Sequence, residues 1–143
     1  MHFTVQFLGE ISEEMTRKIS DALNSLEFTP FLISFVGIGV FPKPSFPRVI
    51  WIGTNEGVNE LEKLAEMIRI KLSQLGFRPD KKFKPHVTIF RVKNKIEDIS
   101  DKLEKFSSYS FGKQMIYEIK LKKSELTPEG PIYTDVLVVK GKK

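Results

Sequence analysis

The sequence contains no cysteine among its 143 residues. This absence excludes disulfide bonds, zinc sites built from thiolates and cysteine nucleophiles. A chain that needs no disulfide suits a reducing compartment, and we expect the protein to act in the cytoplasm.

Long apolar runs and several common site motifs are absent as well. No stretch approaches the roughly 20 apolar residues of a membrane span, and no basic region followed by an apolar core opens the chain, so we expect neither membrane insertion nor secretion. There is no Gly-x-x-x-x-Gly-Lys phosphate loop, no dinucleotide fingerprint and no serine nucleophile elbow. The two histidines lack a His-x-x-x-His spacing, and we expect no metal and no cofactor.

The composition is that of one soluble domain with a basic surface. Hydrophobic residues make up 41% of the chain and charged residues 29%, and the length suits one domain of about 100–150 residues. A net charge of +5 and a pI near 9.4 favour an anionic partner such as nucleic acid. A lysine-rich solvated surface would give the same totals.

Both histidines occur in the same short pattern, in His2-Phe3-Thr4-Val5 and in His86-Val87-Thr88-Ile89. The β-branched and aromatic residues around them predict strands. In a strand, a histidine and the threonine two places on share a face. The repeated pattern predicts a paired site; the alternative is two strand histidines in unrelated places.

Periodicity divides the chain into strands and helices. The predicted strands cover residues 3–8, 31–41, 48–53, 84–92, 115–122 and 133–139. Prolines 42, 44 and 47 predict a stiff turn after the second of these strands. Ser12 is the predicted N-cap of a first helix, Gly76 is expected to end a second helix from Val58, and Ile96 to Phe106 predict a third.

These elements repeat in order. After each His-x-Thr motif come a helix, a long strand, a proline-containing turn and another strand. If the two copies pack about a pseudo-two-fold axis, His2 and His86 meet across one cleft. A strand and a helix precede the second motif, but only Met1 precedes the first. We therefore expect either incomplete symmetry or a missing upstream strand and helix, which would leave a sheet edge or apolar surface uncovered.

Opposed histidines suit displacement at phosphorus, because one imidazole can take a proton from the attacking oxygen while the other protonates the leaving oxygen. Thr4 and Thr88 would donate hydroxyl hydrogen bonds to the nonbridging oxygens. Positive charge would stabilise the charge that develops there, and residues 78–95 carry seven basic side chains against the single acid Asp80. The lysines among them could equally form a solvated loop, whereas Arg91 lies on the other side of the motif.

The residues quoted above resemble the RNA 2′,3′-cyclic phosphodiesterases, also called 2′-5′ RNA ligases, of the two-histidine phosphoesterase superfamily. Residues 2–9 are similar to the first family motif, His-x-Thr-Leu-x-Phe-Leu-Gly, with Val5 in place of Leu. Residues 86–91 resemble the second HxTx motif, with Arg91 in its expected place but Ile89 and Phe90 where Leu and a small residue are common. Residues 124–133 are similar to a third family segment, so the resemblance runs the length of the chain.

The resemblance implies an α+β fold, with two pseudo-symmetric lobes of antiparallel β-sheet and outer helices around a central basic cleft. It implies one two-lobed phosphoesterase domain over residues 1–143, without the family's N-terminal strand and helix. It also implies metal-independent hydrolysis of RNA 2′,3′-cyclic phosphate to a 2′-phosphate, and it allows 2′-5′ RNA ligase activity. His2 would protonate the leaving oxygen, His86 would activate water, and Thr4, Thr88 and Arg91 would bind the substrate.

The expected partner is RNA with a 2′,3′-cyclic phosphate end, such as a tRNA fragment, bound by a monomer that does not associate with membranes. Two alternatives remain open. The chain could be a noncatalytic RNA-binding module that keeps the basic cleft but has lost the histidine geometry, or both motifs could be merely structural.

Overall fold

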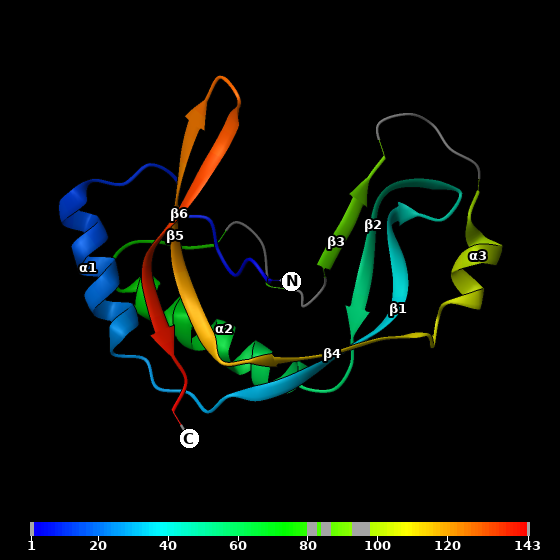
Figure 1. Cartoon of the computed structure of the whole chain (residues 1–143), viewed down its shortest axis with the longest axis horizontal. Coiled ribbons are helices and arrows are strands. Elements are labelled where there is room, and N and C mark those ends of the chain that lie inside the picture. The colour runs from blue at the N-terminus through cyan, green and yellow to red at the C-terminus, as the bar shows by residue number, and fades with distance from the viewer. Residues whose placement is uncertain (1, 80–82, 84–86, 93–97, 143) are drawn as a thin grey trace.

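The computed structural model describes residues 2–79, 83, 87–92 and 98–142, with the backbone alone for residues 87–91. Helices and strands alternate irregularly along it, and the strands form two antiparallel sheets, so the expected α+β class is confirmed (Figure 1). The elements are α1 (Glu13–Asn24), β1 (Phe31–Lys43), β2 (Phe46–Thr54), α2 (Val58–Ser73), β3 (Val87–Arg91), α3 (Ser100–Lys105), β4 (Ser110–Ile116), β5 (Glu118–Thr127) and β6 (Gly130–Lys140).

The first helix begins where the sequence predicts. The Ser12 hydroxyl accepts a hydrogen bond from the Met15 amide at 3.1 Å, which satisfies one of the free donors of the first turn. Glu13 and Glu14 follow, where their carboxylates favour the positive end of the helix dipole. The apolar stripe of α1 faces the protein interior, with Ile19 fully buried.

The larger sheet has the strand order β3-β2-β1-β4. β1 and β2 form a long hairpin in which Pro42 pairs with Pro47 and Lys43 with Phe46. The turn is therefore shorter than the predicted proline segment, because two of the prolines lie within the ends of the strands. β3 lies at one edge of this sheet, with Val49 opposite Arg91 and Trp51 opposite Thr88.

The predicted strand over residues 3–8 is wrong. This segment pairs with no strand among the described residues and lies along the protein as an extended chain. A strand requires a hydrogen-bonded neighbour as well as a suitable side-chain pattern. Here the packing of Phe3, Val5 and Leu8 against the two cores holds the segment in place, with no strand beside it in the described part of the chain.

The single strand predicted over residues 115–122 is also wrong, because β4 and β5 belong to different sheets. β4 pairs with β1 in the larger sheet, β5 pairs with β6 in the smaller one, and Tyr117 lies between them. The chain thus crosses from one sheet to the other in one extended run (Figure 1). The alternation of apolar and charged residues starts only at Glu118, and the run Met115-Ile116-Tyr117 before it marks the place where the chain leaves one sheet for the other.

Helix α2 contributes to both hydrophobic cores. Leu61, near its start, packs with Ile33, Phe35 and Ile52 of the larger sheet. Farther along, Leu64, Ile68 and Leu72 pack with residues of α1 and β6. The helix ends at Ser73, before the predicted boundary at Gly76. No helix in the described part of the chain is long and apolar enough to cross a bilayer.

The backbone just before α2 permits only glycine. Gly57 has φ +84°, and a Cβ there would lie 2.1 Å from the Leu32 carbonyl oxygen. The helix therefore starts in close backbone contact with β1.

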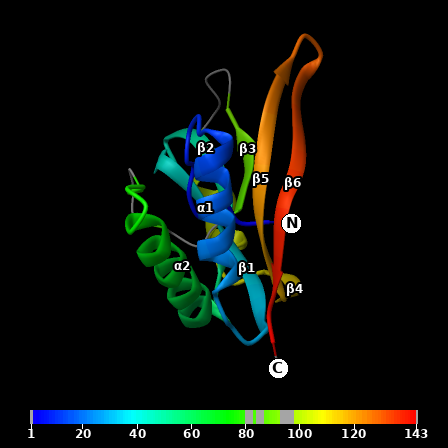
Figure 2. The ribbon, with the colours of Figure 1, turned by 90° about the vertical axis from the view of Figure 1, so that its left-hand side faces the viewer.

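Helices α1 and α2 cover one side of the β5–β6 hairpin and leave its opposite side open (Figure 2). The N-terminus lies between this hairpin and β3 of the larger sheet (Figure 1). The two sheets are unequal, since the smaller one contains only β5 and β6 among the described residues.

Candidate active site

The first His-x-Thr motif lies at the junction of the two hydrophobic cores. The Phe3 ring stacks on Phe35 of β1, with centroids 6.0 Å apart and an interplanar angle of 11°. Two residues on, Val5 packs against the core that α1, α2 and β6 share, and Leu8 does the same. The segment is therefore anchored to one core by Phe3 and to the other by Val5 and Leu8.

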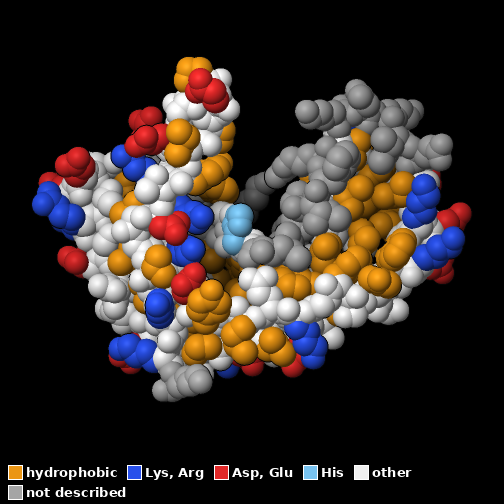
Figure 3. Space-filling model, in the orientation of Figure 1, with side chains coloured by type: hydrophobic (Ala, Val, Ile, Leu, Met, Phe, Trp, Pro, Cys, Tyr) orange, Lys and Arg blue, Asp and Glu red, His pale blue; other side chains and the backbone are white. Residues whose placement is uncertain are grey.

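This anchoring turns His2 and Thr4 outward. Phe3 and Val5 are partly buried, whereas His2 and Thr4 are exposed. The predicted placement of histidine and threonine on one face thus holds for the first motif, although the segment is not a strand. In Figure 3 the histidine side chain, drawn in pale blue, borders the hollow in the middle of the molecule. Of the two histidines in the sequence, the described residues include His2 alone.

The second motif is described through its backbone. β3 carries Thr88 and Arg91 along the edge of the larger sheet, in register with Trp51 and Val49 of β2. Figure 1 places β3 on the side of this sheet that faces the N-terminus. His86 lies outside the described residues, so the pairing of the two histidines stays a prediction. So do the roles of Lys81, Lys82, Lys84, Lys93 and Lys95, which also lie outside them.

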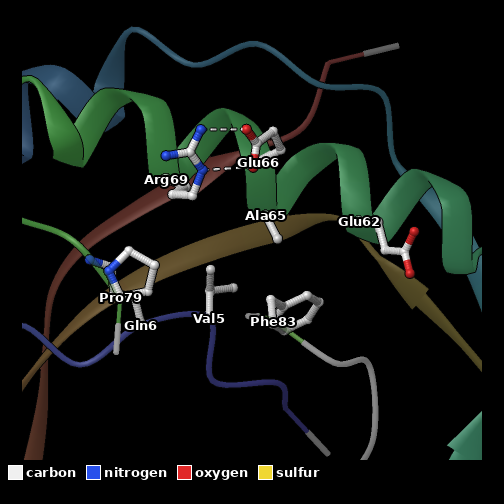
Figure 4. A pocket seen from close by; sticks show the side chains of 8 residues that line it. All are labelled: Val5, Gln6, Glu62, Ala65, Glu66, Arg69, Pro79 and Phe83. Carbon is white, nitrogen blue, oxygen red and sulfur yellow. Dashed lines mark hydrogen bonds and ion pairs between the residues drawn. The ribbon is translucent and has the colours of Figure 1, made fainter. Parts of the chain in front are cut away.

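Beside the first motif lies a pocket of about 240 Å³, formed by the N-terminal segment, one face of α2 and the chain after it (Figure 4). Its lining residues are Val5, Gln6, Glu62, Ala65, Glu66, Arg69, Pro79 and Phe83. The Gln6 side-chain nitrogen Nε2 is buried and has no hydrogen-bond partner among the described residues. Gln6, two residues beyond Thr4, is therefore a buried amide in the wall of the pocket.

An ion pair borders the pocket on α2. The Arg69 Nε donates to Glu66 Oε2 at 2.8 Å, and its Nη2 lies 2.5 Å from Glu66 Oε1. The hydrogen bond from Arg69 lowers the pKa of Glu66, and the same hydrogen bond raises the pKa of Arg69. The pair fixes the guanidinium against the carboxylate at the pocket rim, as Figure 4 shows.

Sequence reasoning missed this pocket. Its α2 residues recur at positions 62, 65, 66 and 69, which is the spacing of one helix face and could have been noticed. Gln6 could not have been singled out, because only its contacts with distant residues bury it. Among the described residues, no group of His, Asp and Glu side chains is arranged to hold a metal ion.

Comparison with known proteins gives a consistent assignment. The family model described as the AKAP7 2′5′ RNA ligase-like domain matches residues 1–136. A protein of Archaeoglobus fulgidus named RNA 2′,3′-cyclic phosphodiesterase is 49% identical over 138 residues, which cover 96% of this chain and 78% of that protein. A Methanocaldococcus jannaschii protein of the same name is 44% identical over 137 residues, covering 93% and 76%.

Solved structures share the fold. The structure of TT0787 of Thermus thermophilus matches with a TM-score of 0.72 at 30% identity, covering 96% of this chain and 75% of that one. Escherichia coli LigT complexed with 3′-AMP matches with a TM-score of 0.73 at 23% identity, covering 98% and 76%. The family match and the curated relatives together establish that this chain belongs to the 2′5′ RNA ligase-like family.

Proposed function

We propose that this chain is an RNA 2′,3′-cyclic phosphodiesterase that converts a cyclic phosphate end to a 2′-phosphate and a free 3′-hydroxyl. Family membership and the name of the Archaeoglobus fulgidus relative support the reaction class. The observation that carries the proposal to particular residues is the outward placement of His2 and Thr4 at the junction of the two cores, where the pale-blue histidine borders the hollow of Figure 3.

The proposed reaction is an in-line displacement at phosphorus. His86 takes a proton from water, whose oxygen forms a new bond to phosphorus. The bond from phosphorus to the 3′-oxygen breaks, and His2 protonates that oxygen as it leaves. The 2′-oxygen keeps its bond to phosphorus, so the product is a 2′-phosphate. With the 5′-hydroxyl of a second RNA in place of water, the same displacement would form a 2′-5′ phosphodiester, which is the ligase activity that the family name implies.

Threonine and arginine side chains complete the proposed site. Thr4 and Thr88 donate hydrogen bonds to the nonbridging oxygens, and Arg91 supplies the positive charge that the transition state requires. β3 brings Thr88 and Arg91 to the sheet edge that faces the N-terminus. The mechanism assigns both proton transfers to histidine and asks for no metal or cofactor.

The proposal extends to the context in which the chain works. We expect RNA fragments with a 2′,3′-cyclic phosphate end as substrates, with tRNA fragments among them, acted on by a monomer in the cytoplasm. The basic net charge of +5 favours such an anionic partner. Sedimentation of the purified chain tests whether it is a monomer. A fluorescent fusion protein tests whether it is located in the cytoplasm.

Product analysis tests the function. The chain should release a 2′-phosphate end, resistant to an enzyme that attacks only 3′-phosphates, from an oligoribonucleotide with a 2′,3′-cyclic phosphate. Turnover should persist in EDTA, because histidines handle both protons. Tight RNA binding without any product would contradict the proposal and favour the noncatalytic RNA-binding module. Loss of turnover in EDTA with recovery on adding a divalent ion would overturn the metal-independent mechanism.

A further inference from the structure

The outer face of the β5–β6 hairpin is the face that turns away from the helices. Ile119 and Leu121 of β5 pack against the core that contains α1 and α2. Because side chains alternate along a strand, Lys120 and Lys122 point to the opposite side. Figure 2 shows that no helix covers this side of the hairpin in the described part of the chain.

Two lysines share one carboxylate on this outer face. Lys120 Nζ lies 3.2 Å from Asp135 Oδ2 and 3.4 Å from Glu118 Oε1. Lys122 Nζ lies 3.4 Å from Asp135 Oδ1. Each ammonium has three donors, so these ion pairs leave donors available, more of them on Lys122 than on Lys120. The side chains are 36%, 46% and 37% exposed for Lys120, Lys122 and Asp135, so solvent and a ligand can reach them.

An exposed aromatic ring continues the same face. Asp135 pairs with Lys122. Tyr133 pairs with Ser124, and on each strand this pair lies two residues closer to the hairpin turn. Tyr133 therefore shares the face of Lys122 and Asp135. Tyr133 is 64% exposed, in a part of β6 near the hairpin turn where residues 131–136 are all exposed, so its ring is open to a ligand. Two lysines with spare donors and an open ring thus lie along one surface, together with the carboxylates of Glu118 and Asp135 that pair with the lysines.

This surface borders the candidate active site. In Figure 3, blue and red side chains over β5 and β6 lie beside the pale-blue histidine, on one face of the molecule. The N-terminal segment contributes Val5 and Leu8 to the core that also contains Val139 of β6. An RNA end held at His2 would therefore have the outer face of β5–β6 next to it.

We propose that the outer face of β5–β6 binds the single-stranded RNA that leads to the cyclic phosphate, with Lys120 and Lys122 on its phosphates and Tyr133 stacked on a base. The inference rests on the proposed function and adds a substrate class to it: oligonucleotides are preferred over mononucleotides. A cyclic phosphate closes the 3′ end, so the bound RNA lies entirely on its 5′ side. A ring stacks on bases that are splayed out of a helix, which favours single strands over duplexes.

The test compares 2′,3′-cyclic AMP with an oligoribonucleotide of about ten nucleotides that ends in the same cyclic phosphate. The wild-type chain should show a higher kcat/KM for the oligonucleotide, and this advantage should fall with salt. In Lys120→Gln/Lys122→Gln the salt slope should flatten by about 0.7 for each RNA phosphate that the lysines no longer neutralise. Tyr133→Ala should reduce the advantage about fivefold or more. Lys18→Gln on α1 removes an exposed ion pair with Glu14 and is the matched control. It should leave kcat/KM unchanged for both substrates.

Asp135→Asn separates RNA binding from a purely structural ion-pair network. If the lysines bind phosphate, neutralising the carboxylate removes a competing anion, so affinity for the oligonucleotide should rise. If they only stabilise the hairpin, Asp135→Asn and the lysine variants will lower Tm and leave the oligonucleotide advantage unchanged, which overturns the proposal. A dimer in sedimentation that Tyr133→Ala dissociates would also overturn it, because a second copy would then cover the face.

The outcomes distinguish this inference from the proposed function. Failure of the wild-type chain to hydrolyse either substrate refutes the proposed function. Fluorescence anisotropy with the same oligonucleotide still tests the outer face in that case. Hydrolysis of both substrates with equal kcat/KM supports the function and refutes the RNA path.

Discussion

His2 is the residue on which the proposed chemistry depends most directly. His2→Ala and His86→Ala should each lower kcat by about 10²–10⁴-fold, the usual contribution of a positioned acid or base. Because His2 is exposed, its replacement should leave Tm unchanged. Steady-state kinetics and thermal unfolding measure the two effects, and Glu10→Ala, at an exposed position of the same segment, is the control. Full kcat in His2→Ala would refute the assignment.

Glu66 tests the ion pair at the pocket rim. Arg69 holds the pKa of Glu66 below its ordinary value of 4.5. A carboxyl group with a lowered pKa in the folded state stabilises that state at pH values above its unfolded pKa. This stabilisation is lost as the pH falls through the folded value. The Tm of wild type should therefore exceed that of Glu66→Gln at neutral pH, and the difference should shrink below about pH 4.5. A difference that persists unchanged at low pH would contradict this origin.

At the residue scale, the sequence predicts which side chains share a face better than it predicts which distant residues bury a side chain. His2 and Thr4 share an open face as their spacing indicates, since alternation needs only an extended backbone. The buried amide of Gln6 has no comparable signal, because Pro79 and the α2 residues that line the same pocket are distant in sequence. The salt link of Asp135 to both lysines depends on a register shift between Leu121 and Lys122, which also needs the fold to be known.

The N-terminal segment is the element whose packing positions the first motif. Phe3→Ala removes the ring that stacks on Phe35 and should lower stability by at least about 1 kcal/mol. It should also lower kcat, because displacing a catalytic group by about 1 Å can cost on the order of 10²-fold in rate. Phe3→Leu keeps most of the apolar packing and should lie between wild type and Phe3→Ala in both stability and kcat. Normal kcat in a destabilised Phe3→Ala would show that this anchor does not position His2.

Helices and strands differ in how far the sequence predicts them. The cap and stripe of α1 are local signals, and both are confirmed. The strand expected over residues 3–8 and the undivided strand over residues 115–122 are wrong because pairing partners determine strands. Those partners come from elsewhere in the chain, and nothing within either segment identifies them.

At the scale of the whole molecule, α2 joins the two cores. Leu61 is 3% exposed in one core and Leu72 is 3% exposed in the other. Leu61→Ala and Leu72→Ala should each cost about 2–5 kcal/mol and should lower the Tm of the same single transition. Calorimetry and thermal unfolding followed by circular dichroism measure the Tm and the number of transitions for each variant. Two separate transitions, each sensitive to one variant, would show that the lobes unfold independently.

The fold class and the family follow from the order of elements and from the three motifs, since these extend over the whole chain. The difference in size between the two sheets could not be predicted from the motifs. Its structural form, a two-stranded sheet beside an extended segment in the described part of the chain, depends on pairing.

The central claim is that His2 and His86 bracket one phosphate, and a crystal structure with bound inorganic phosphate tests it most directly. The imidazole nitrogens that face the anion should lie roughly 5–8 Å apart, each within hydrogen-bond reach of it, with Thr4 and Thr88 directed at its oxygens. Histidines on separate surfaces, or a phosphate bound away from His2, would contradict the account.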